Sequence, residues 1–441
     1  MIELTVMDRR WQMVLDCQGA ERPPFSQGTL QSFRERVIAH ELDAVLFERT
    51  VALARESGGY SAARLRAAFD ASPLWGAGRV EDTFNLIGRA ALHVVRTAAE
   101  RLGRPFAEVA SEAGIPIVAA TSIKAGLDID WDDRDARQRG IAKLLEQVQA
   151  LGQWLETELR SELQQPPLSE QWELVQALVE QDTEPDPGGG GGRRIKRGVA
   201  KDRRISVSDP DMRHGRKSKR KRIDGYKRHV AVDVDSPGVI YGVAVTPANA
   251  PERVASQELL AQLDAHGAQL GELLIDRGYL GDAYIEARRQ AGVKVSCKPF
   301  PLHNAGRFDK RDFIMDLDAR TVRCPGDVTV PLRIGKVLRF PRARCRDCAM
   351  RQRCTRARTA GRSLSIHPQE PFFLELRREA KTPEGREQLR RRTKVEHGLA
   401  RIHNRQGDRA RYRGLRKNLY DLRRHAALSN LSIVDRMRQA A

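Results

Sequence analysis

Three carboxylates, far apart in the chain, lie in settings that suit phosphodiester chemistry. Asp70 ends a short apolar stretch, Asp276 follows the apolar triplet at 273–275, and Glu396 lies in a basic segment with a helical pattern. If the three converge, they offer the hard oxygen ligands that Mg²⁺ prefers. Two such ions, about 4 Å apart, support in-line displacement at a phosphodiester. Because the chain holds 58 acidic residues, the surrounding elements must show whether these three belong together.

Each carboxylate also has an ordinary interpretation. Asp276 is the best single candidate, because an apolar triplet followed by Asp-Arg-Gly-Tyr is unusual for a plain loop. Its alternative role is that of a turn residue or a helix N-cap. Asp70 precedes Ser-Pro and also suits a turn, and most helical glutamates like Glu396 are solvated.

Positive charge is concentrated in two segments of this +19 chain. Residues 193–228 carry 16 Lys and Arg against four Asp, and residues 386–424 carry 14 against four Asp and Glu. A surface that only confers solubility would mix both signs along the chain. The pattern therefore predicts a polyanionic partner, and nucleic acid fits best.

Basic residues in these segments are expected to contact DNA phosphates. The candidates of the first segment are Arg213, Arg216, Lys217, Lys219, Arg220, Lys221, Arg222 and Lys227. The alternative for this run is a solvated loop. In the second segment Arg411 and Arg413 alternate with Tyr412, a mixture that suits a strand-binding helix or loop.

No run of 18 apolar residues is present, so we expect no membrane span. The first residues lack the apolar core of a signal peptide, and six cysteines in 441 residues are too few for a secreted disulfide scaffold. We expect a cytoplasmic protein that lies beside DNA.

Hydrophobic periodicity predicts an α/β fold. Residues 1–110 have mainly helical patterns, interrupted by a short strand that is expected at 64–70. Period-two segments at 228–234 and 239–245 flank a turn and predict a hairpin. Helices at 251–266 and 282–290 then alternate with strands at 273–275 and 293–297. Asp276 thus follows the carboxyl end of a strand, where sites of α/β sheets form, and Gly278 and Gly281 are expected to turn the backbone sharply.

Composition divides the chain into four parts. Residues 1–62 are expected to form a helical DNA-binding or assembly domain. Residues 63–299 hold the first part of the core, with a helical insertion at about 95–200 that includes the glycine run 188–192, a linker signal. Residues 300–383 contain most of the cysteines. Residues 384–441 are expected to be helical, with breaks near Gly407 and Gly414, and carry Glu396.

Four cysteines form a candidate zinc site. Cys345 and Cys348 have the Cys-x2-Cys spacing that lets two thiolates bind one ion, Cys354 follows shortly after, and Cys324 would complete a tetrahedral set. The alternative is four reduced thiols in a basic subdomain. Cys17 and the remaining cysteine, Cys297, are expected to be packing residues.

Several motifs, in order, carry a resemblance to a known family. The matching segments are 70–78, 81–83, 209–218, 224–229, 245–249, 276–279, 395–396 and 411–415. Over roughly residues 8–435 the chain resembles the DDE transposases of bacterial insertion sequences, in the branch with a helical N-terminal domain. The resemblance implies an RNase H-like mixed sheet interrupted by insertions, one of them between the first strand and the hairpin.

The same resemblance implies a mechanism and partners. Asp70, Asp276 and Glu396 would be the catalytic triad that binds two Mg²⁺ or Mn²⁺ ions. The activity would be strand cleavage and strand transfer at element ends. The partners would be double-stranded DNA, namely terminal inverted repeats and target DNA, and a second copy of the chain or a higher assembly.

Two departures from the family pattern are visible. Relatives often carry an arginine before the Glu and a basic residue about seven positions after it. Arg392 fits the first position, but His403 occupies the second, so Arg401 or Arg405 would serve there. All three arginines are expected to contact DNA. The chain also begins close to the first matching residues, and we expect a shortened N-terminal domain.

Two alternatives remain open at this stage. One is an RNase H-like nuclease that hydrolyses DNA without joining it. The other is a zinc-stabilised DNA-binding protein, a decayed transposase. Carboxylates more than about 10 Å apart, beyond the reach of two ions ~4 Å apart, would favour the second alternative.

Overall fold

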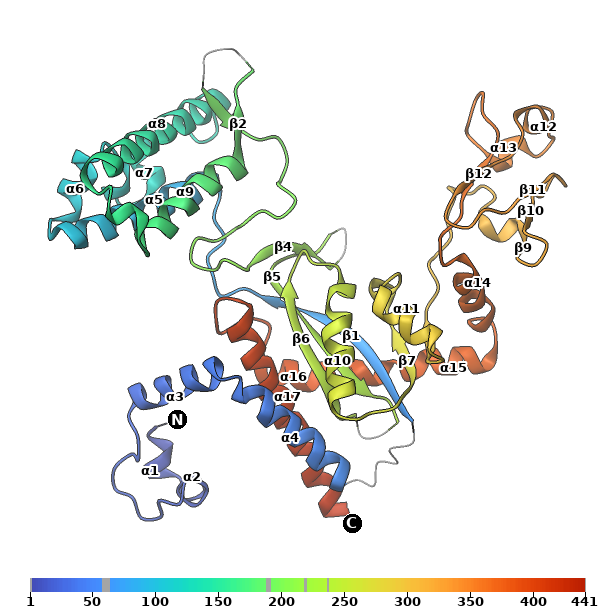
Figure 1. Cartoon of the computed structure of the whole chain (residues 1–441), viewed down its shortest axis with the longest axis horizontal. Coiled ribbons are helices and arrows are strands. Elements are labelled where there is room, and N and C mark those ends of the chain that lie inside the picture. Colours follow the sequence, from blue (N-terminus) through green and yellow to red (C-terminus); the bar gives the residue numbers. More distant parts are fainter. Residues whose placement is uncertain (1, 58–63, 188–191, 218–219, 236–237, 441) are drawn as a thin grey trace.

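A six-stranded mixed sheet forms the centre of the computed structural model, which describes residues 2–57, 64–187, 192–217, 220–235 and 238–440 (Figure 1). The strand order is β4-β5-β1-β7-β8, and β6 pairs with β5. The strands are β1 (Leu65–Trp75), β4 (Arg213–Arg216), β5 (Arg222–Asp233), β6 (Ile240–Pro247), β7 (Leu270–Ile275) and β8 (Lys294–Cys297).

The sheet joins an antiparallel half to a parallel half. β1, β5 and β6 are antiparallel neighbours, whereas β7 runs parallel to β1 and β8 parallel to β7. This is the RNase H-like arrangement, and it follows largely helical N-terminal residues. The predicted α/β fold class is therefore confirmed.

The strands differ in detail from the sequence prediction. The hairpin of β5 and β6 is confirmed, with Val230 opposite Val243; Ser236 and Pro237 of its turn lie outside the described residues. β1 is longer than expected and contains Pro73. Proline is tolerated there because the pairing of β7 with β1 ends at Ala68, and beyond it the described residues add only a single bridge, between Trp75 and Arg409.

Part of the basic run forms a strand. β4 pairs antiparallel with the start of β5, with Arg216 opposite Arg222, so the loop alternative is wrong for residues 213–216. Lys219 lies outside the described residues. The strand fixes the backbone positions of Arg213 and Arg216 at the edge of the sheet.

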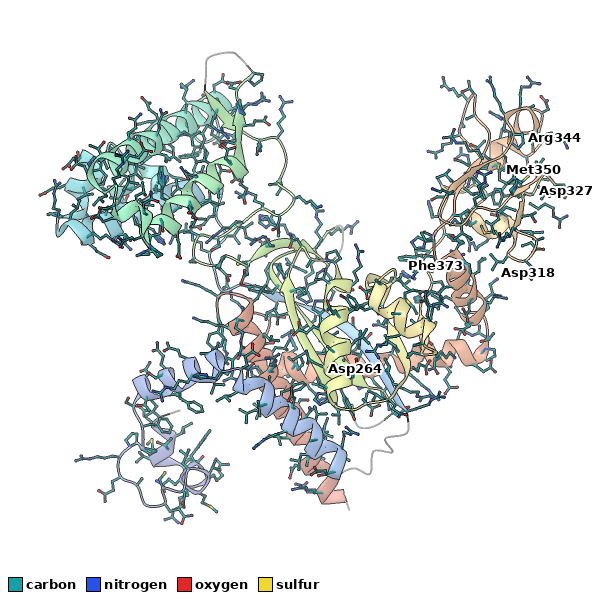
Figure 2. All side chains as sticks on the ribbon, in the orientation of Figure 1. Asp264, Asp318, Asp327, Arg344, Met350 and Phe373 are labelled. Atoms are coloured by element: carbon teal, nitrogen blue, oxygen red, sulfur yellow. The ribbon has the colours of Figure 1, made fainter. Side chains whose placement is uncertain are left out.

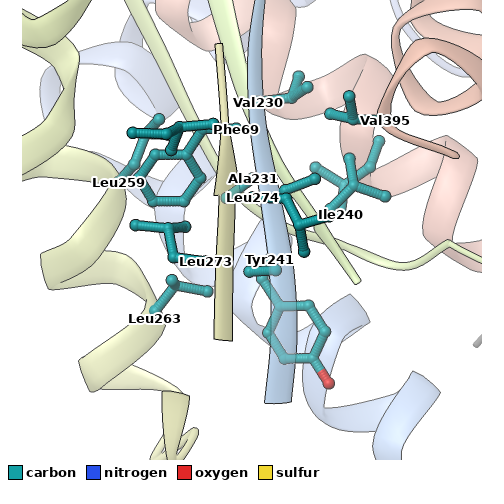
Figure 3. Close-up of a cluster of buried hydrophobic side chains, with 14 of the residues drawn as sticks. Phe69, Val230, Ala231, Ile240, Tyr241, Leu259, Leu263, Leu273, Leu274 and Val395 are labelled. Carbon is teal, nitrogen blue, oxygen red and sulfur yellow. The ribbon is translucent and has the colours of Figure 1, made fainter. Parts of the chain in front are cut away.

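Helices cover both faces of the sheet. Figure 3 shows Leu259 and Leu263 of α10 (Ser256–Ala265) on one side of the strands, and Val395 of α16 (Thr393–Gln406) on the other. All three side chains belong to the main buried core. α11 (Ala283–Gln290) packs on β8 and α10, and α17 (Leu415–Ala440) packs on β6 and α16.

The N-terminal residues begin with α1 (Leu4–Met7), α2 (Arg9–Val14), α3 (Gln27–Ala39) and α4 (Leu42–Ser57). α4 packs along α17, with its Asp43 in ion pairs with Arg416 and Arg423. Phe47 and Val51 of α4 are buried in the main core. α4, which lies in the predicted N-terminal part at 1–62, therefore packs as part of the sheet domain.

A helical bundle lies between β1 and β5 in the chain. It consists of α5 (Thr83–Leu102), α6 (Phe106–Glu112), α7 (Ile123–Leu127), α8 (Arg134–Glu158) and α9 (Leu168–Asp182). The bundle has its own hydrophobic core and stands apart from the sheet in Figure 1. Short strands β2 (Thr183–Pro185) and β3 (Arg193–Ile195) follow it. Gly188–Gly191 of the glycine run lie outside the described residues.

A second lobe follows β8. Short strands β9 (Ile314–Asp316), β10 (Thr321–Arg323), β11 (Thr329–Pro331), β12 (Val337–Arg339) and β13 (Ser363–Ser365) surround a small core with α12 (Arg342–Arg346) and α13 (Arg351–Cys354). We name it the cysteine lobe, residues 308–366. α14 (Glu370–Glu379) and α15 (Pro383–Arg391) lead back to α16. In the described residues no helix combines the length and apolarity that a membrane crossing requires.

Candidate active site

The sheet register brings Asp70 and Asp276 together. β1 and β7 are parallel neighbours, with Ala68 opposite Leu274. Asp70 and Asp276 each lie two residues further along, so they are level with each other and share a face of the sheet, because side chains alternate along a strand. Asp276 Oδ1 also accepts a hydrogen bond from the Arg277 N–H at 2.7 Å. It therefore caps a short 3₁₀ turn, as its alternative interpretation allowed.

Helix α16 places Glu396 over the same face. Val395, Leu399 and Ile402 are its buried side and pack on the sheet. Gly398 permits a close approach, because a Cβ at this position would lie 2.8 Å from Val232 Cγ2. Glu396 follows Val395 at the edge of this buried side, and its side chain is 59% exposed.

The three predicted carboxylates line one pocket of about 530 Å³. Other lining residues are Ser72, Arg216, Lys217, Lys227 and Glu252. The carboxylates are thus brought together, although they come from a strand, a strand end and a helix. This placement does not favour the alternative that required widely separated carboxylates.

Arg392 lies between two of the carboxylates. Its Nη1 is 3.3 Å from Asp70 Oδ2, and its Nη2 is 3.8 Å from Glu396 Oε1. Burial raises the pKa of Asp70, Arg392 and the Ala71 N–H lower it, and the charges of Asp276 and Glu396 raise it again; the net direction is upward. The pocket therefore holds more negative charge than one arginine neutralises.

A fourth carboxylate, Glu252, belongs to this pocket and was not predicted. Burial raises its pKa, Lys227 lowers it, and the charges of Asp276 and Asp70 raise it again, with a net increase. A Cβ at Gly278 would lie 2.0 Å from Glu252 Oε2. Gly278 therefore provides space for Glu252, whereas the predicted turn conformation is found only at Gly281, with φ +82°.

The basic wall of the pocket consists of Arg216, Lys217 and Lys227. Arg216 and Lys217 are exposed. Lys227 is partly buried and donates to the Ala250 carbonyl at 2.8 Å, and burial lowers its pKa. Three of the predicted DNA-contacting residues thus lie beside the carboxylates.

The remaining basic candidates differ in their exposure and in their contacts. Arg213 donates to Asp202 and to the Pro210 carbonyl, and Arg222 donates to Asp224. Exposed candidates are Arg220, Lys221, Arg411 and Arg413. The guanidinium of Arg401 bonds Ser429 and the Gly238 carbonyl, and Arg405 bonds Ser432 at 2.8 Å. Arg401 and Arg405 therefore connect α16 to neighbouring elements.

Arg228 is a buried cation that sequence reasoning missed. It is 1% exposed and donates to Ser72 on β1, and to Gln406 and the Gly407 carbonyl at the end of α16. Its Nη2 also lies 3.1 Å from His403 Nδ1, so the position where relatives carry a basic residue contacts Arg228 here. Burial lowers the pKa of Arg228 to about 10. This residue fixes α16 relative to the strand that carries Asp70.

A buried histidine, His229, lies next to the turn that follows Asp276. His229 Nδ1 lies 2.8 Å from Tyr279 Oη, and its Nε2 lies 2.9 Å from Thr246 Oγ1. Burial lowers the pKa of His229 to about 3, so the ring is neutral near pH 7. These bonds connect the hairpin to the turn that follows Asp276.

The donor set of the pocket fits hard divalent cations. Carboxylate oxygens from three elements line one pocket, and the pKa of Asp70 is raised first by burial and further by the charges of Asp276 and Glu396. As the side chains stand, no three His, Cys, Asp or Glu residues within the described ranges form a closed metal cage. The carboxylates share a pocket without meeting at one point.

The four predicted zinc ligands also lie together, in the cysteine lobe. Cys324, Cys345, Cys348 and Cys354 line a single cavity of about 30 Å³. Burial raises the pKa of the Cys354 thiol, Arg362 lowers it, and the other three cysteines raise it further. Cys297 is buried in the main core, in agreement with a packing role.

Comparison with protein families identifies one match. A family model described as "Transposase DDE domain" matches residues 196–431, more than half of the chain. The matched range includes Asp276 and Glu396 and begins after Asp70. No curated protein and no solved structure matches the chain.

Proposed function

The chain belongs to the transposase DDE domain family of metal-dependent phosphoryl-transfer enzymes, and from this premise we propose that it cleaves DNA at the ends of an insertion sequence and joins them to target DNA. The observation that carries this proposal is the shared pocket, where Asp70, Asp276 and Glu396 lie beside Arg216, Lys217 and Lys227. Anionic groups for cations and cationic groups for phosphates are both needed for phosphodiester chemistry.

We assign Asp70, Asp276 and Glu396 as ligands of two divalent cations, Mg²⁺ or Mn²⁺. When bound, such ions lower the pKa of an attacking hydroxyl and neutralise charge that develops at the phosphate. Backbone N–H groups of Ala71 and Arg277 orient the two aspartates by donating to them. Glu396 is more exposed and is free to change rotamer toward the aspartates.

The basic wall has a separate role in this proposal. Arg216 and Lys217 on the exposed rim would bind phosphates of the DNA strand and place it in the pocket. Lys227 lines the same pocket and is more buried than Arg216 and Lys217. It would bind the phosphate under attack. Arg392 balances the charge of Asp70 and Glu396 before DNA enters.

The Asp276→Asn variant provides the first test. It keeps the size and the hydrogen-bonding shape of the side chain but removes a charged ligand. We expect DNA binding within about twofold of wild type and a loss of cleavage of more than about 100-fold. Retained Mg²⁺-dependent cleavage would overturn the assignment of Asp276. The Glu396→Gln variant tests the least constrained ligand in the same assay.

Strand transfer separates the proposal from the nuclease alternative. An oligonucleotide with an element end and a free 3′-hydroxyl is incubated with plasmid DNA and Mg²⁺. A transposase yields joined product, whereas a nuclease yields only hydrolysed DNA. A zinc-stabilised DNA-binding protein would yield neither product while still binding the oligonucleotide.

Transposition must bring two element ends together, so we propose a dimer or a larger assembly on DNA. Residues 2–41 and the helical bundle lie outside the sheet domain and are our candidates for assembly and end recognition. Light scattering of the protein with end DNA should give at least two chains per complex; one chain per complex would contradict this part of the proposal.

A further inference from the structure

The cysteine lobe contains a second candidate metal site, separate from the carboxylate pocket. We propose that Cys324, Cys345, Cys348 and Cys354 bind one structural zinc ion. All four are free thiols that line the same cavity, whose volume of about 30 Å³ exceeds the space of one water-sized sphere. Figure 2 labels Arg344 and Met350, which also line this cavity, in the lobe that stands apart from the sheet.

The turn around Cys324 has the bonding of a zinc-binding knuckle. The Cys324 N–H donates to the Val328 carbonyl at 3.0 Å, and the Asp327 N–H donates to the Cys324 carbonyl at 2.9 Å. The Val328 N–H in turn points at Cys324 Sγ, at 3.4 Å. An amide that donates to a sulfur stabilises the thiolate, the form that binds metal.

Gly326 opens the space between two of the sulfurs. A Cβ at this position would lie 3.1 Å from Cys348 Sγ and 3.7 Å from Cys324 Sγ. The two sulfurs, 24 positions apart in the sequence, therefore face the same small volume. Any larger residue at position 326 would fill it.

The other three cysteines are held by a folded loop. Arg351 donates to the Cys345 carbonyl at 2.8 Å and, from its other terminal nitrogen, to the Ala357 carbonyl at 2.8 Å. The Arg351 N–H donates to the Cys348 carbonyl at 3.0 Å. These bonds close the loop on itself and direct the cysteines of α12 and α13 toward the cavity.

The charge around the cavity fits a thiolate cluster. Arg344, Arg351 and Arg362 line it together with the four cysteines. Zinc with four thiolates carries a net charge of about −2, which these arginines would balance. In the described part of the chain, the buried Nε of Arg362 has no hydrogen-bond partner, so one donor beside the cavity is still available for a thiolate.

The apolar core of the cysteine lobe is small, so a cross-link would stabilise the lobe. Its core has eight buried apolar residues, and each of its five strands is three residues long. Cores of this size rarely hold a fold alone, and structural zinc is a common remedy. As described, the four sulfurs do not yet form a closed cage; a rotamer change moves a cysteine sulfur by about 3 Å.

The test uses the full chain, expressed with added zinc and purified under reducing conditions. We expect about one zinc ion per chain by elemental analysis, and strong thiolate-to-cobalt absorption after replacement by Co²⁺. Cys348→Ala and Cys354→Ala should lose most of the metal, whereas Cys17→Ala should keep it. Neither wild-type measurement depends on whether a variant folds.

Three outcomes would overturn the zinc proposal. They are wild-type protein with no zinc and no cobalt–thiolate absorption, equal metal loss in Cys17→Ala, and metal loss in Asp276→Asn, which would place the ion in the carboxylate pocket. Chelation should make residues 308–366 sensitive to protease while α4, α17 and the sheet stay protected. Zinc content is measured without DNA, so this result is independent of transposase activity.

Discussion

At Asp70, burial and two neighbouring carboxylates oppose ionisation, and Arg392 only partly compensates. A raised pKa means that the folded chain binds a proton on Asp70 more tightly than the unfolded chain does. Ionised Asp70 therefore lowers the free energy of unfolding at neutral pH, and this cost is relieved as the pH falls through the raised pKa. A bound cation relieves the same repulsion.

The Asp70→Asn variant should consequently lose cleavage without losing stability. Without metal, we expect its Tm to equal that of wild type or to exceed it by up to about 2 °C. Mg²⁺ should raise the Tm of wild type and have little effect on the variant, because a ligand stabilises only the chain that binds it. Differential scanning fluorimetry with and without Mg²⁺ checks both. Equal stabilisation of the two proteins by Mg²⁺ would contradict the role of Asp70 as a ligand.

Asp70 should also determine the acid limb of the pH–rate profile. Cation binding requires the carboxylate, so cleavage should fall as the pH drops through a pKa above the ordinary aspartate value of about 3.9. Arg392 lowers the pKa of Asp70, so Arg392→Gln should move the limb to higher pH. Excess Mg²⁺ should move it to lower pH by competing with protons. A limb that is unaffected by both changes would show that another group controls it.

The sequence singled out three acidic residues that line one pocket and several of their basic neighbours, but not Glu252 or Arg228. Asp276 was visible because it follows an apolar strand, and Asp70 and Glu396 gained weight from family motifs. Glu252 follows a proline in a helical segment and resembles a solvated glutamate until Gly278 is seen to make room for it. Arg228 continues the alternation of a strand, and nothing local shows that it is buried.

At the scale of elements, the approach of α16 to the sheet controls the position of Glu396. Gly398 lies against Val232 of β5, and the helix and strand are held at this distance by Arg228. Gly398→Ala would improve helix propensity but place a methyl group 2.8 Å from Val232 Cγ2. Overpacking of this kind costs about 1–3 kcal/mol and shifts the helix.

We therefore expect Gly398→Ala to lower the Tm and to reduce cleavage, with DNA binding retained. Val232→Ala removes the opposing methyl groups, so the double variant should recover cleavage relative to Gly398→Ala alone. This coupling is measured as a double-mutant cycle. Additive effects, or wild-type cleavage by Gly398→Ala, would show that the contact does not position Glu396.

Element prediction from sequence succeeded where the periodicity was local. The hairpin, the helix carrying Glu396 and the helix breaks at Gly407 and Gly414 are all present. β4 was not foreseen, because its three basic residues and one glycine have low strand propensity and are held by pairing with β5. Likewise, β1 extends beyond the predicted strand because it pairs with β5 as far as Trp75, not because of its own composition.

Across the chain, the basic side chains differ in how well they are placed to contact DNA. Arg216 and Lys217 are exposed at the carboxylate pocket, whereas Arg213 and Arg401 are partly buried and bond neighbouring elements. Only part of the +19 charge is therefore placed to replace counterions on DNA. The salt dependence of binding measures that part directly, because each phosphate contact releases condensed ions.

The Arg216→Ala, Lys217→Ala double variant should weaken binding to all DNA sequences alike. For duplex DNA we expect the slope of log K against log salt to become shallower by about 2, one contact for each residue. Arg288→Ala serves as the control, because Arg288 of α11 pairs with Asp264 of α10 and its loss should leave the slope unchanged. The slope is obtained from fluorescence anisotropy at several salt concentrations. An unchanged slope in the double variant, or an equal change in the control, would mean that DNA does not follow the basic wall into the carboxylate pocket.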